Sequence, residues 1–217
     1  MANIICIMGE SGAGKTTSMR NLDPKTTFYI DCDKKGLSWR GWKKQYNDEG
    51  NPPNYYKTDE PSIVLALMKK INDQDNMKKV ETVIVDTLNG IMVADEMRRT
   101  KEKGYDKWQD LAQSIYEIID YSLTMRDDLT VIFVAHTQTE RDDSGFSFTR
   151  IKTSGKKLDK ITLETKLNTV LLAKCVDGKY MFETQANHST AKTPMGLMEE
   201  KEIENDITAV IKALKEY

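Results

Sequence analysis

Near its start the chain reads Asn3-Ile4-Ile5-Cys6-Ile7-Met8-Gly9-Glu10-Ser11-Gly12-Ala13-Gly14-Lys15-Thr16-Thr17. The run from Ile4 to Met8 is continuously apolar, which predicts a short strand buried on both faces. A glycine-rich turn follows it, and we expect a helix that begins near Lys15. This order of strand, turn and helix directs backbone N–H groups and the positive end of a helix at one anion. The stretch therefore predicts a phosphate-binding loop at the end of the first strand.

The loop matches the pattern G-x-x-x-x-G-K-[ST] of nucleotide-binding P-loops. Its glycines let the backbone turn so that several N–H groups point at one phosphate. Lys15 is expected to bring a full charge to the β- and γ-phosphates, and the Thr16 hydroxyl to ligate Mg²⁺. ATP and Mg²⁺ are therefore the expected cofactors. The expected nucleotide-binding residues are Gly9, Glu10, Ser11, Gly12, Ala13, Gly14, Lys15, Thr16 and Thr17.

Length and composition indicate an ordinary globular protein, with 217 residues of which 39% are apolar and 30% charged. We expect one domain over 1–217. The net charge of −2 means that nucleic-acid binding would need local basic patches. The sequence shows neither an apolar run of about 20 residues nor a signal peptide. We therefore expect no membrane partner. Because Cys6, Cys32 and Cys175 lie far apart in the sequence, we expect buried, reduced thiols in a cytoplasmic protein.

Further apolar strands are expected at 27–30, 82–86 and 131–135, with helices at 62–71 and, as one long helix, between the last two of these strands. Alternation of buried strands and helices predicts a three-layer α/β fold with a mostly parallel central sheet. Strands at 169–174 and 180–184 flank Asp177-Gly178, which predicts an antiparallel hairpin at the edge of that sheet. We expect a loop-rich insert at 36–61 and a mobile loop at 137–160. An amphipathic helix ends the chain, with an apolar stripe that runs from Ile203 to Leu214, and Asp206 is a candidate cap for at least its second half.

Acidic and polar residues follow three of these strands. Asp86 closes the strand at 82–86, where a carboxylate would help to hold Mg²⁺. Asp33 follows the second strand and is our candidate for orienting the water that attacks ATP, whereas Asp31 is expected to end that strand or orient its neighbours. His136 follows the strand at 131–135 and could donate a hydrogen bond to the γ-phosphate; a histidine satisfied at the sheet edge is the alternative.

Four segments in this order, 9–17, 31–33, 83–86 and 133–136, resemble the ATPase core of RecA-type recombinases. The chain is most similar in length to small bacteriophage RecA-like ATPases, some of which act in single-strand annealing or recombination. The resemblance implies an ATPase with Lys15, Asp33 and His136 as catalytic residues, located in an infected bacterial host if encoded by a phage. Asp33 and His136 depart from the glutamate and glutamine of that family.

The resemblance also implies single-stranded DNA as a partner, bound by loops after the third and fourth strands. Interleaved cations and aromatic rings suit single strands, because bases stack while phosphates meet charge. The stronger candidates for contacting DNA are Phe146, Phe148, Arg150, Lys152, Lys156 and Lys157. A weaker set, for which a solvated helix end is the alternative, is Arg98, Arg99, Lys101, Lys103, Gly104, Tyr105, Lys107 and Trp108.

A homo-oligomer is expected, as a ring or short assembly rather than a RecA-type filament. Lys192 is a candidate cation acting on a neighbour's active site, with an ordinary loop lysine as the alternative. The aromatic residues of the 36–61 insert are expected to pack it onto the sheet, although they could form a nucleic-acid surface.

Two other functions fit the sequence. One is a small-molecule kinase of nucleosides or nucleotides, whose arginine lid would use Arg141 and Arg150 of the 137–160 loop. The other is a nucleotide-dependent binding module that hydrolyses ATP very slowly, which the departures at Asp33 and His136 would suit.

Overall fold

The computed structural model describes residues 1–50, 53–104, 106–154 and 162–217. One sheet of nine strands runs through these residues in the order β3-β2-β4-β5-β1-β7-β8-β9, and β6 pairs with β5 off this path. The strands are β1 (Asn3–Gly9), β2 (Thr27–Asp31), β3 (Tyr55–Lys57), β4 (Thr82–Asp86), β5 (Thr130–Arg141), β6 (Ser147–Ile151), β7 (Thr169–Val176), β8 (Lys179–Glu183) and β9 (Glu202–Glu204).

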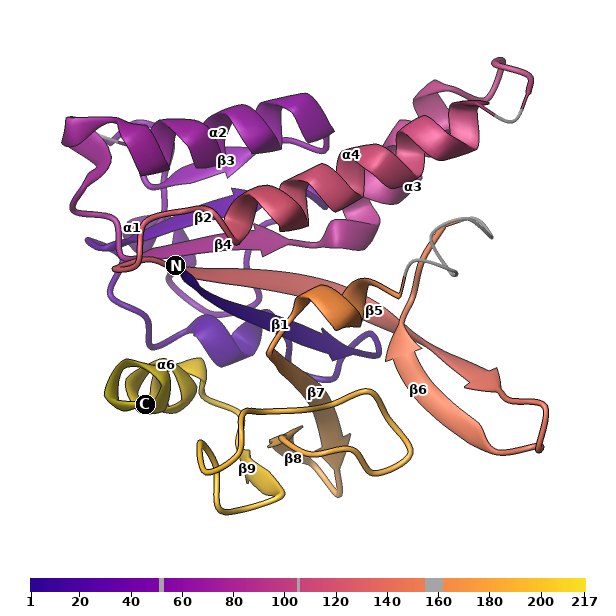
Figure 1. Ribbon diagram of the computed structural model, residues 1–217. Helices are drawn as coiled ribbons and strands as arrows, with labels where there is room; N and C mark the ends of the chain where they lie inside the picture. The colour runs from indigo at the N-terminus through magenta and orange to yellow at the C-terminus, as the bar shows by residue number, and fades with distance from the viewer. Residues whose placement is uncertain (51–52, 105, 155–161) are drawn as a thin grey trace.

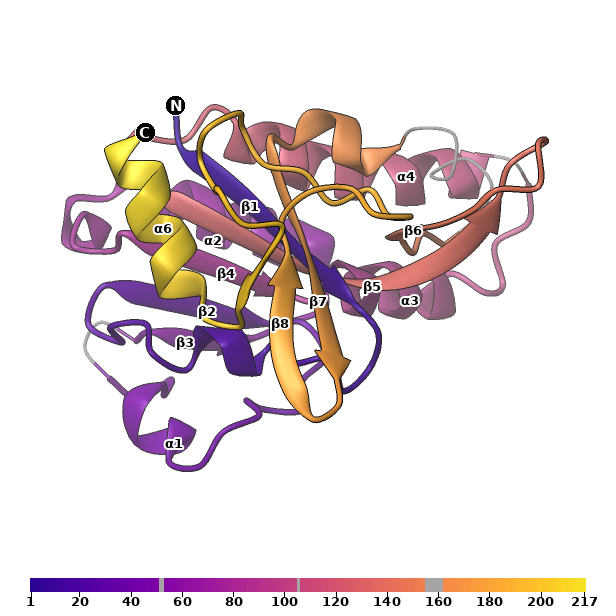
Figure 2. The ribbon, with the colours of Figure 1, turned by 90° about the horizontal axis from the view of Figure 1, so that it is seen from below.

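Helices cover both faces of this sheet (Figures 1 and 2). The α-helices are α1 (Trp42–Gln45), α2 (Pro61–Asp73), α3 (Leu88–Arg98), α4 (Asp106–Ser122) and α6 (Ile207–Glu216). Within the same described ranges, three 3₁₀ turns accompany them: η1 (Thr17–Met19), η2 (Asp75–Met77) and η3 (Leu163–Lys166). Figure 1 shows α2, α3 and α4 on one side of the sheet and α6 on the other.

Alternate residues of each central strand supply the two cores. In β1, Cys6 belongs to the cluster that packs under α2 and α4, whereas Ile5 and Ile7 belong to the cluster on the α6 side. All three side chains are fully buried. A strand covered on both faces explains why the sequence of β1 is apolar throughout rather than alternating. The architecture is the predicted three-layer α/β arrangement.

The central strands are parallel, with β1 lying between β5 and β7, and β4 between β5 and β2. In this register Gly9 pairs with His136 and Asp31 pairs with Asp86. The carboxyl ends of parallel strands therefore bring the predicted site residues to one edge of the sheet.

The predicted hairpin around Asp177-Gly178 is confirmed. Asp177 has φ 51° and Gly178 has φ 77°, the left-handed conformations that a two-residue hairpin turn requires. β7 pairs parallel to β1, and β8 and β9 then extend the sheet antiparallel. Glu202–Glu204 is thus a strand rather than the start of the terminal helix, which begins after its Asp206 cap.

The prediction of an α-helix that begins near Lys15 is wrong. Only the 3₁₀ turn η1 follows the loop. Asp23 precedes Pro24, which disfavours helical backbone at Asp23, and β2 begins at Thr27. The short remaining stretch holds a 3₁₀ turn, a form used in pieces of this length.

The expected mobile loop at 137–160 is also corrected. β5 continues to Arg141 and pairs antiparallel with β6, forming a hairpin that extends past the rest of the sheet (Figure 1). We call residues 130–151 the β5–β6 hairpin. Threonines and aromatic or β-branched residues suit paired strands, and Gly145 turns the chain with φ 87°. Residues 155–160 lie outside the described part of the chain.

Three smaller expectations also need correction. The segment between β4 and β5 forms two helices, α3 and α4, rather than one. Gly104 lies between them with φ 115°, a conformation that no α-helix contains, and Thr87 caps α3 by accepting a hydrogen bond from the Gly90 N–H. The 36–61 insert contains α1 and β3. Cys175 is exposed, whereas Cys6 and Cys32 are buried free thiols as expected.

Candidate nucleotide site

The glycine-rich loop borders a cavity of about 400 Å³ at the carboxyl ends of the strands. Its lining residues are Ser11, Gly12, Gly14, Lys15, Thr16, Thr17, Lys35, Ser38, Thr87, His136 and Tyr180. Most of the predicted nucleotide-binding residues therefore face this space. Glu10 and Ala13 line a neighbouring cavity instead, together with Thr137 and Lys174.

Backbone geometry sets where the loop can run. Gly12 and Gly14 have φ 82° and 89°, which favour glycine. A Cβ at Gly14 would lie 2.7 Å from Cδ1 of Tyr180, so β8 packs directly on the loop. A Cβ at Gly9 would lie 2.6 Å from the Ala173 carbonyl oxygen, so Gly9 allows the close approach of β7.

Lys15 is buried, and its ammonium donates to the carbonyl oxygens of Gly9 and Glu10, both at 2.8 Å. Burial lowers the pKa of Lys15, and the carboxylate of Asp86 opposes this shift. Two backbone acceptors thus hold the Lys15 ammonium beside the loop, where it can bind a phosphate group.

Thr16 and Asp86 meet as predicted. The Thr16 hydroxyl donates to Oδ2 of Asp86 at 2.9 Å. The Tyr29 hydroxyl donates to the same oxygen. Burial raises the pKa of Asp86, although both of these hydrogen bonds favour its charged form.

The other carboxylate oxygen of Asp86, Oδ1, is buried and has no hydrogen-bond partner among the described residues. A hydroxyl and a carboxylate oxygen are hard ligands of the kind that Mg²⁺ takes together with phosphates and water. The pair therefore fits Mg²⁺, with Thr16 and Asp86 as the residues that would hold it.

Asp33 lies beside this pair, half-buried between β2 and α3. Its Oδ1 accepts from the Thr87 hydroxyl at 2.9 Å, and its Oδ2 forms an ion pair with Lys35 at 2.5 Å. A Cβ at Gly90 would lie 2.4 Å from Oδ1, so glycine there makes room for the carboxylate. Thr87 and Lys35 line the cavity, while Asp33 stands behind them.

Asp31 has the structural role that the sequence indicated. Its Oδ2 accepts from the Tyr55 hydroxyl at 2.6 Å and from the Gly36 N–H at 2.8 Å. These bonds join the end of β2 to β3 and to the turn at Gly36.

His136 lines the cavity at the point where β5 passes the loop. Its backbone N–H donates to Oδ1 of Asn89 at 2.7 Å, and the Asn89 amide donates to the Lys152 carbonyl oxygen at 2.8 Å. Burial and the nearby Lys15 charge lower the pKa of His136. The imidazole is therefore neutral near pH 7 and able to donate one hydrogen bond.

Several residues of the site were not predicted from the sequence, chiefly Tyr29, Thr87, Asn89 and Tyr180. Thr87 directly follows Asp86, so its position offered a signal. Tyr29, Asn89 and Tyr180 reach the site only through the strand register and packing, which the sequence does not state. Glu10 also has an unforeseen contact: its carboxylate accepts from the Thr137 hydroxyl at 2.6 Å.

The candidate DNA-contacting residues are separated by the fold. Arg150 is buried and paired with Glu140 at 3.2 Å and with Glu164 at 3.7 Å, which corrects its assignment as a surface contact. Phe146 is 47% exposed. Phe148 is half-buried and Lys152 is exposed. Lys156 and Lys157 lie outside the described residues.

An aromatic stack marks the tip of the β5–β6 hairpin. Phe146 stacks on His188, with ring centroids 4.7 Å apart and an interplanar angle of 21°. The His188 carbonyl oxygen accepts from the Thr149 N–H at 2.8 Å, which fixes this loop against β6. His188 thus has a defined partner.

Basic residues of the weaker set are matched by carboxylates. Arg98 pairs with Asp59 at 2.9 Å, and Arg99 pairs with Glu102 and Asp110 at 2.7 and 2.9 Å. This favours the alternative of a helix end with mixed charges. Tyr105 lies outside the described residues.

Aromatic residues of the insert pack onto the sheet as expected. Tyr46 is buried, and its ring meets Tyr29 and Trp39 edge-on at centroid distances of 5.7 and 6.0 Å.

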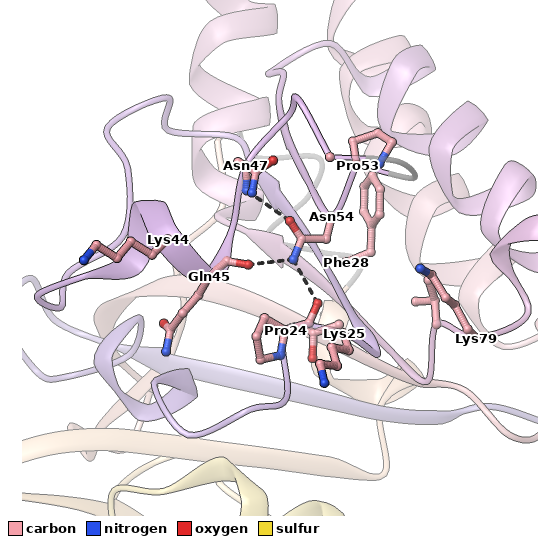
Figure 3. A pocket seen from close by; sticks show the side chains of 12 residues that line it. Pro24, Lys25, Phe28, Lys44, Gln45, Asn47, Pro53, Asn54 and Lys79 are labelled. Atoms are coloured by element: carbon pink, nitrogen blue, oxygen red, sulfur yellow. Dashed lines mark hydrogen bonds between the residues drawn. The ribbon is translucent and has the colours of Figure 1, made fainter.

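A further cavity, of about 340 Å³, lies at the amino end of β2, away from the loop (Figure 3). Asn54 holds its wall together, because its amide donates to the Pro24 and Gln45 carbonyl oxygens at 2.8 Å and accepts from the Asn47 N–H at 3.0 Å. The polar groups of Asn54 are therefore engaged in holding the insert.

Comparison with protein families gives a match to the AAA domain over residues 1–194. The chain belongs to the AAA domain family. It is therefore a nucleotide-binding P-loop ATPase domain, while the RecA-type recombination role stays a prediction. The sequence has no match among curated proteins.

Among solved structures, this AAA domain is similar to the P4 protein from bacteriophage phi6 in complex with ADP, at 16% identity and a TM-score of 0.38. The alignment covers 84% of this chain and 55% of that one, so our chain spans about half of its length. In the described part of this AAA domain, no helix has the length and apolar character needed to cross a bilayer.

Proposed function

We propose that this AAA domain hydrolyses ATP with Mg²⁺ at the cavity beside the glycine-rich loop. The observation that carries the proposal is the Thr16–Asp86 hydrogen bond of 2.9 Å next to Lys15, with Oδ1 of Asp86 buried and without a partner in the described residues. A buried carboxylate oxygen without a donor is costly unless a cation or water meets it.

In this proposal the glycine-rich loop and Lys15 bind the phosphates of ATP. Lys15 exchanges its two carbonyl partners for the β- and γ-phosphates, and the N–H groups around Gly12 and Gly14 point at the same anion. Mg²⁺ held by Thr16 and Asp86 would neutralise phosphate charge. Tyr180 borders the cavity from β8 and is half exposed there.

Asp33 orients and deprotonates the attacking water in this proposal. Its two oxygens now contact Thr87 and Lys35, both of which line the cavity. Entry of the γ-phosphate draws Lys35 toward negative charge and frees Oδ2 for water. His136 donates to the γ-phosphate as a neutral imidazole.

Asp33→Asn tests this assignment. We expect turnover to fall by at least about 100-fold, while ATP affinity stays near the wild-type value. Equal single-turnover rates for wild type and Asp33→Asn would contradict the role. If wild type itself turned over only at that low rate, the protein would act as a nucleotide-dependent binding module.

Single-stranded DNA binding in recombination or annealing is a second candidate function, favoured by the stacked rings of Phe146 and His188 at the hairpin tip. Exposed aromatic rings provide platforms for bases, and Lys152 adds a cation directly after β6. β5 carries both His136 and the start of this hairpin, so a change at the γ-phosphate could reach the DNA surface along one strand. A homo-oligomer acting on DNA remains part of this proposal.

Phe146→Ala and Lys152→Ala test the DNA role. We expect the affinity for an oligonucleotide to fall by about 10-fold or more for Phe146→Ala, because stacking contributes about 1–3 kcal/mol per base. Asp143→Ala at the same exposed tip is the control and should not weaken binding. Unchanged affinity in both test variants would remove this surface from consideration.

The kinase alternative is weakened at Arg150, one of the two arginines expected in its lid, whereas Arg141 is exposed. The Arg141 guanidinium donates to the Gly145 carbonyl oxygen at 2.8 Å, and Arg150 is buried. Transfer of phosphate from ATP to a nucleoside or nucleotide in a substrate screen would nevertheless favour a kinase over a hydrolase.

A further inference from the structure

Tyr29 reaches the nucleotide site from an unexpected direction. It lies on β2, is fully buried, and pairs in register with Ile84 of β4. Its hydroxyl reaches the carboxyl end of β4, where it donates to Oδ2 of Asp86. A carboxylate oxygen can only accept, so the phenol O–H is the donor in this contact.

The two oxygens of Asp86 are unequally used. Oδ2 accepts from two hydroxyls, those of Thr16 and Tyr29, which come from different segments. Oδ1 has no hydrogen-bond partner among the described residues. Two donors on one oxygen fix the rotation of the carboxylate and leave the other oxygen for a further ligand. Groups that orient a metal ligand in this way strongly affect metal affinity.

The ring of Tyr29 is held independently of its hydroxyl. It packs edge-on against Tyr46 at a centroid distance of 5.7 Å and beside Tyr55 at 6.2 Å. Removal of the hydroxyl alone should therefore leave the aromatic packing in place.

We propose that Tyr29 is a positioning residue for Mg²⁺, which holds Asp86 so that Oδ1 faces the ion or its water shell. The inference rests on the proposed Mg²⁺-dependent nucleotide binding. It adds a residue on β2 to the pair Thr16 and Asp86, and gives a reason for a tyrosine hydroxyl within a strand whose residues are all buried.

The chain supplies a matched control one strand further out. The Tyr55 hydroxyl donates to Oδ2 of Asp31 at 2.6 Å, which is also a buried tyrosine–carboxylate contact at the sheet edge. Asp31 accepts from the Gly36 N–H and is not part of the proposed metal pair. Tyr55→Phe thus removes the same chemical group from the same aromatic cluster without touching Asp86.

The experiment compares ADP affinity in Mg²⁺ with ADP affinity in EDTA, by calorimetry on the full chain. For wild type we expect tighter binding in Mg²⁺. Tyr29→Phe should lose about 10-fold or more of this Mg²⁺ gain and keep the EDTA affinity, whereas Tyr55→Phe should keep both. A structural role for the hydroxyl would lower both affinities together.

An undiminished Mg²⁺ gain in Tyr29→Phe would overturn this inference while leaving the proposed function intact. Absence of any Mg²⁺ gain in wild type would overturn the Mg²⁺ assignment and this inference with it. If Tyr29→Phe does not fold, ¹³C-tyrosine NMR of wild type gives the answer: Mg²⁺ added to the ADP complex should shift the Tyr29 Cζ signal and spare that of Tyr55. An unmoved Tyr29 signal would contradict the proposal.

Discussion

At the scale of single residues, two glycines of the loop share a backbone conformation but differ in their surroundings. Gly12 and Gly14 both have positive φ, of 82° and 89°. A Cβ at Gly12 would meet nothing within 4 Å, whereas one at Gly14 would lie 2.7 Å from the Tyr180 ring and 3.2 Å from Oδ1 of Asn205. A side chain would therefore strain the backbone at both positions, but it would clash with neighbouring residues only at Gly14.

We therefore predict that Gly12→Ala lowers the free energy of unfolding by about 1–2 kcal/mol, the cost of a left-handed alanine. Gly14→Ala should cost more and should also weaken nucleotide binding, because the loop must move away from β8. Chemical denaturation and ADP titration measure both effects. Equal effects of the two substitutions would mean that contact with Tyr180 does not constrain the loop.

His136 makes stability depend on pH in a defined direction. Its pKa is lowered from the ordinary value of 6.5 in the folded chain. Between the two pKa values the unfolded chain binds more protons, so acid favours unfolding. The stabilisation from neutral His136 is complete above pH 6.5 and is lost as the pH falls toward and below the folded-state pKa.

His136→Gln should therefore lose less stability than wild type when the pH falls from about 7.5 to about 5.5. Denaturant unfolding at the two pH values measures the difference. The comparison isolates this residue, because the acidic groups and His188 are present in both proteins. Identical losses would show that His136 is not held neutral by the fold.

At the scale of elements, the β5–β6 hairpin depends on a charged pair beneath it. Arg150 and Glu164 are both buried, and Glu164 also accepts from the Ile151 N–H at 2.8 Å. Removing one partner of a buried pair leaves a charge without compensation, at a cost of about 3–5 kcal/mol. Arg150 is therefore a stabilising residue in a segment whose composition suggested a DNA-binding loop.

Arg150→Met should lower the free energy of unfolding by about 3 kcal/mol. Lys152→Met, on an exposed side chain two residues further on, should change it by no more than about 0.5 kcal/mol. Thermal unfolding of both variants checks this contrast. A stable Arg150→Met protein with weakened DNA binding would restore the original assignment of Arg150.

The N-terminus of α6 is tied to the turn after the loop. One oxygen of Asp206 accepts from the Thr208 N–H at 3.0 Å, and the other accepts from the Asn21 amide at 2.7 Å. Asp206→Ala should cost about 1 kcal/mol as the loss of a helix cap, measured by denaturant unfolding. Lys212→Ala on the exposed face of α6 is the control; an equal effect there would argue against the cap.

At the scale of the whole molecule, periodicity and motif order predicted the layers, the parallel sheet, the late hairpin and the residues that follow each strand. These features depend on the spacing of apolar residues and on short motifs, which can be recognised without knowledge of the tertiary contacts. Pairings between distant segments could not be predicted: Tyr29 with Asp86, Phe146 with His188, and Arg150 with Glu164 all depend on strand register and loop paths. The prediction of a helix at Lys15 was wrong because Pro24 and the early start of β2 leave too few residues for the α-helix that usually follows a P-loop.

In the proposed mechanism, this AAA domain hydrolyses ATP through its glycine-rich loop. The most direct measurement is steady-state ATP hydrolysis by wild type, Lys15→Ala and the control Lys43→Ala, with Mg²⁺ and with EDTA. Lys43 is exposed on α1, apart from the residues that line the cavity. We expect Mg²⁺-dependent turnover in wild type and Lys43→Ala, and a loss of about 100-fold or more in Lys15→Ala. Turnover that survives in Lys15→Ala, or in EDTA, would contradict the proposed mechanism.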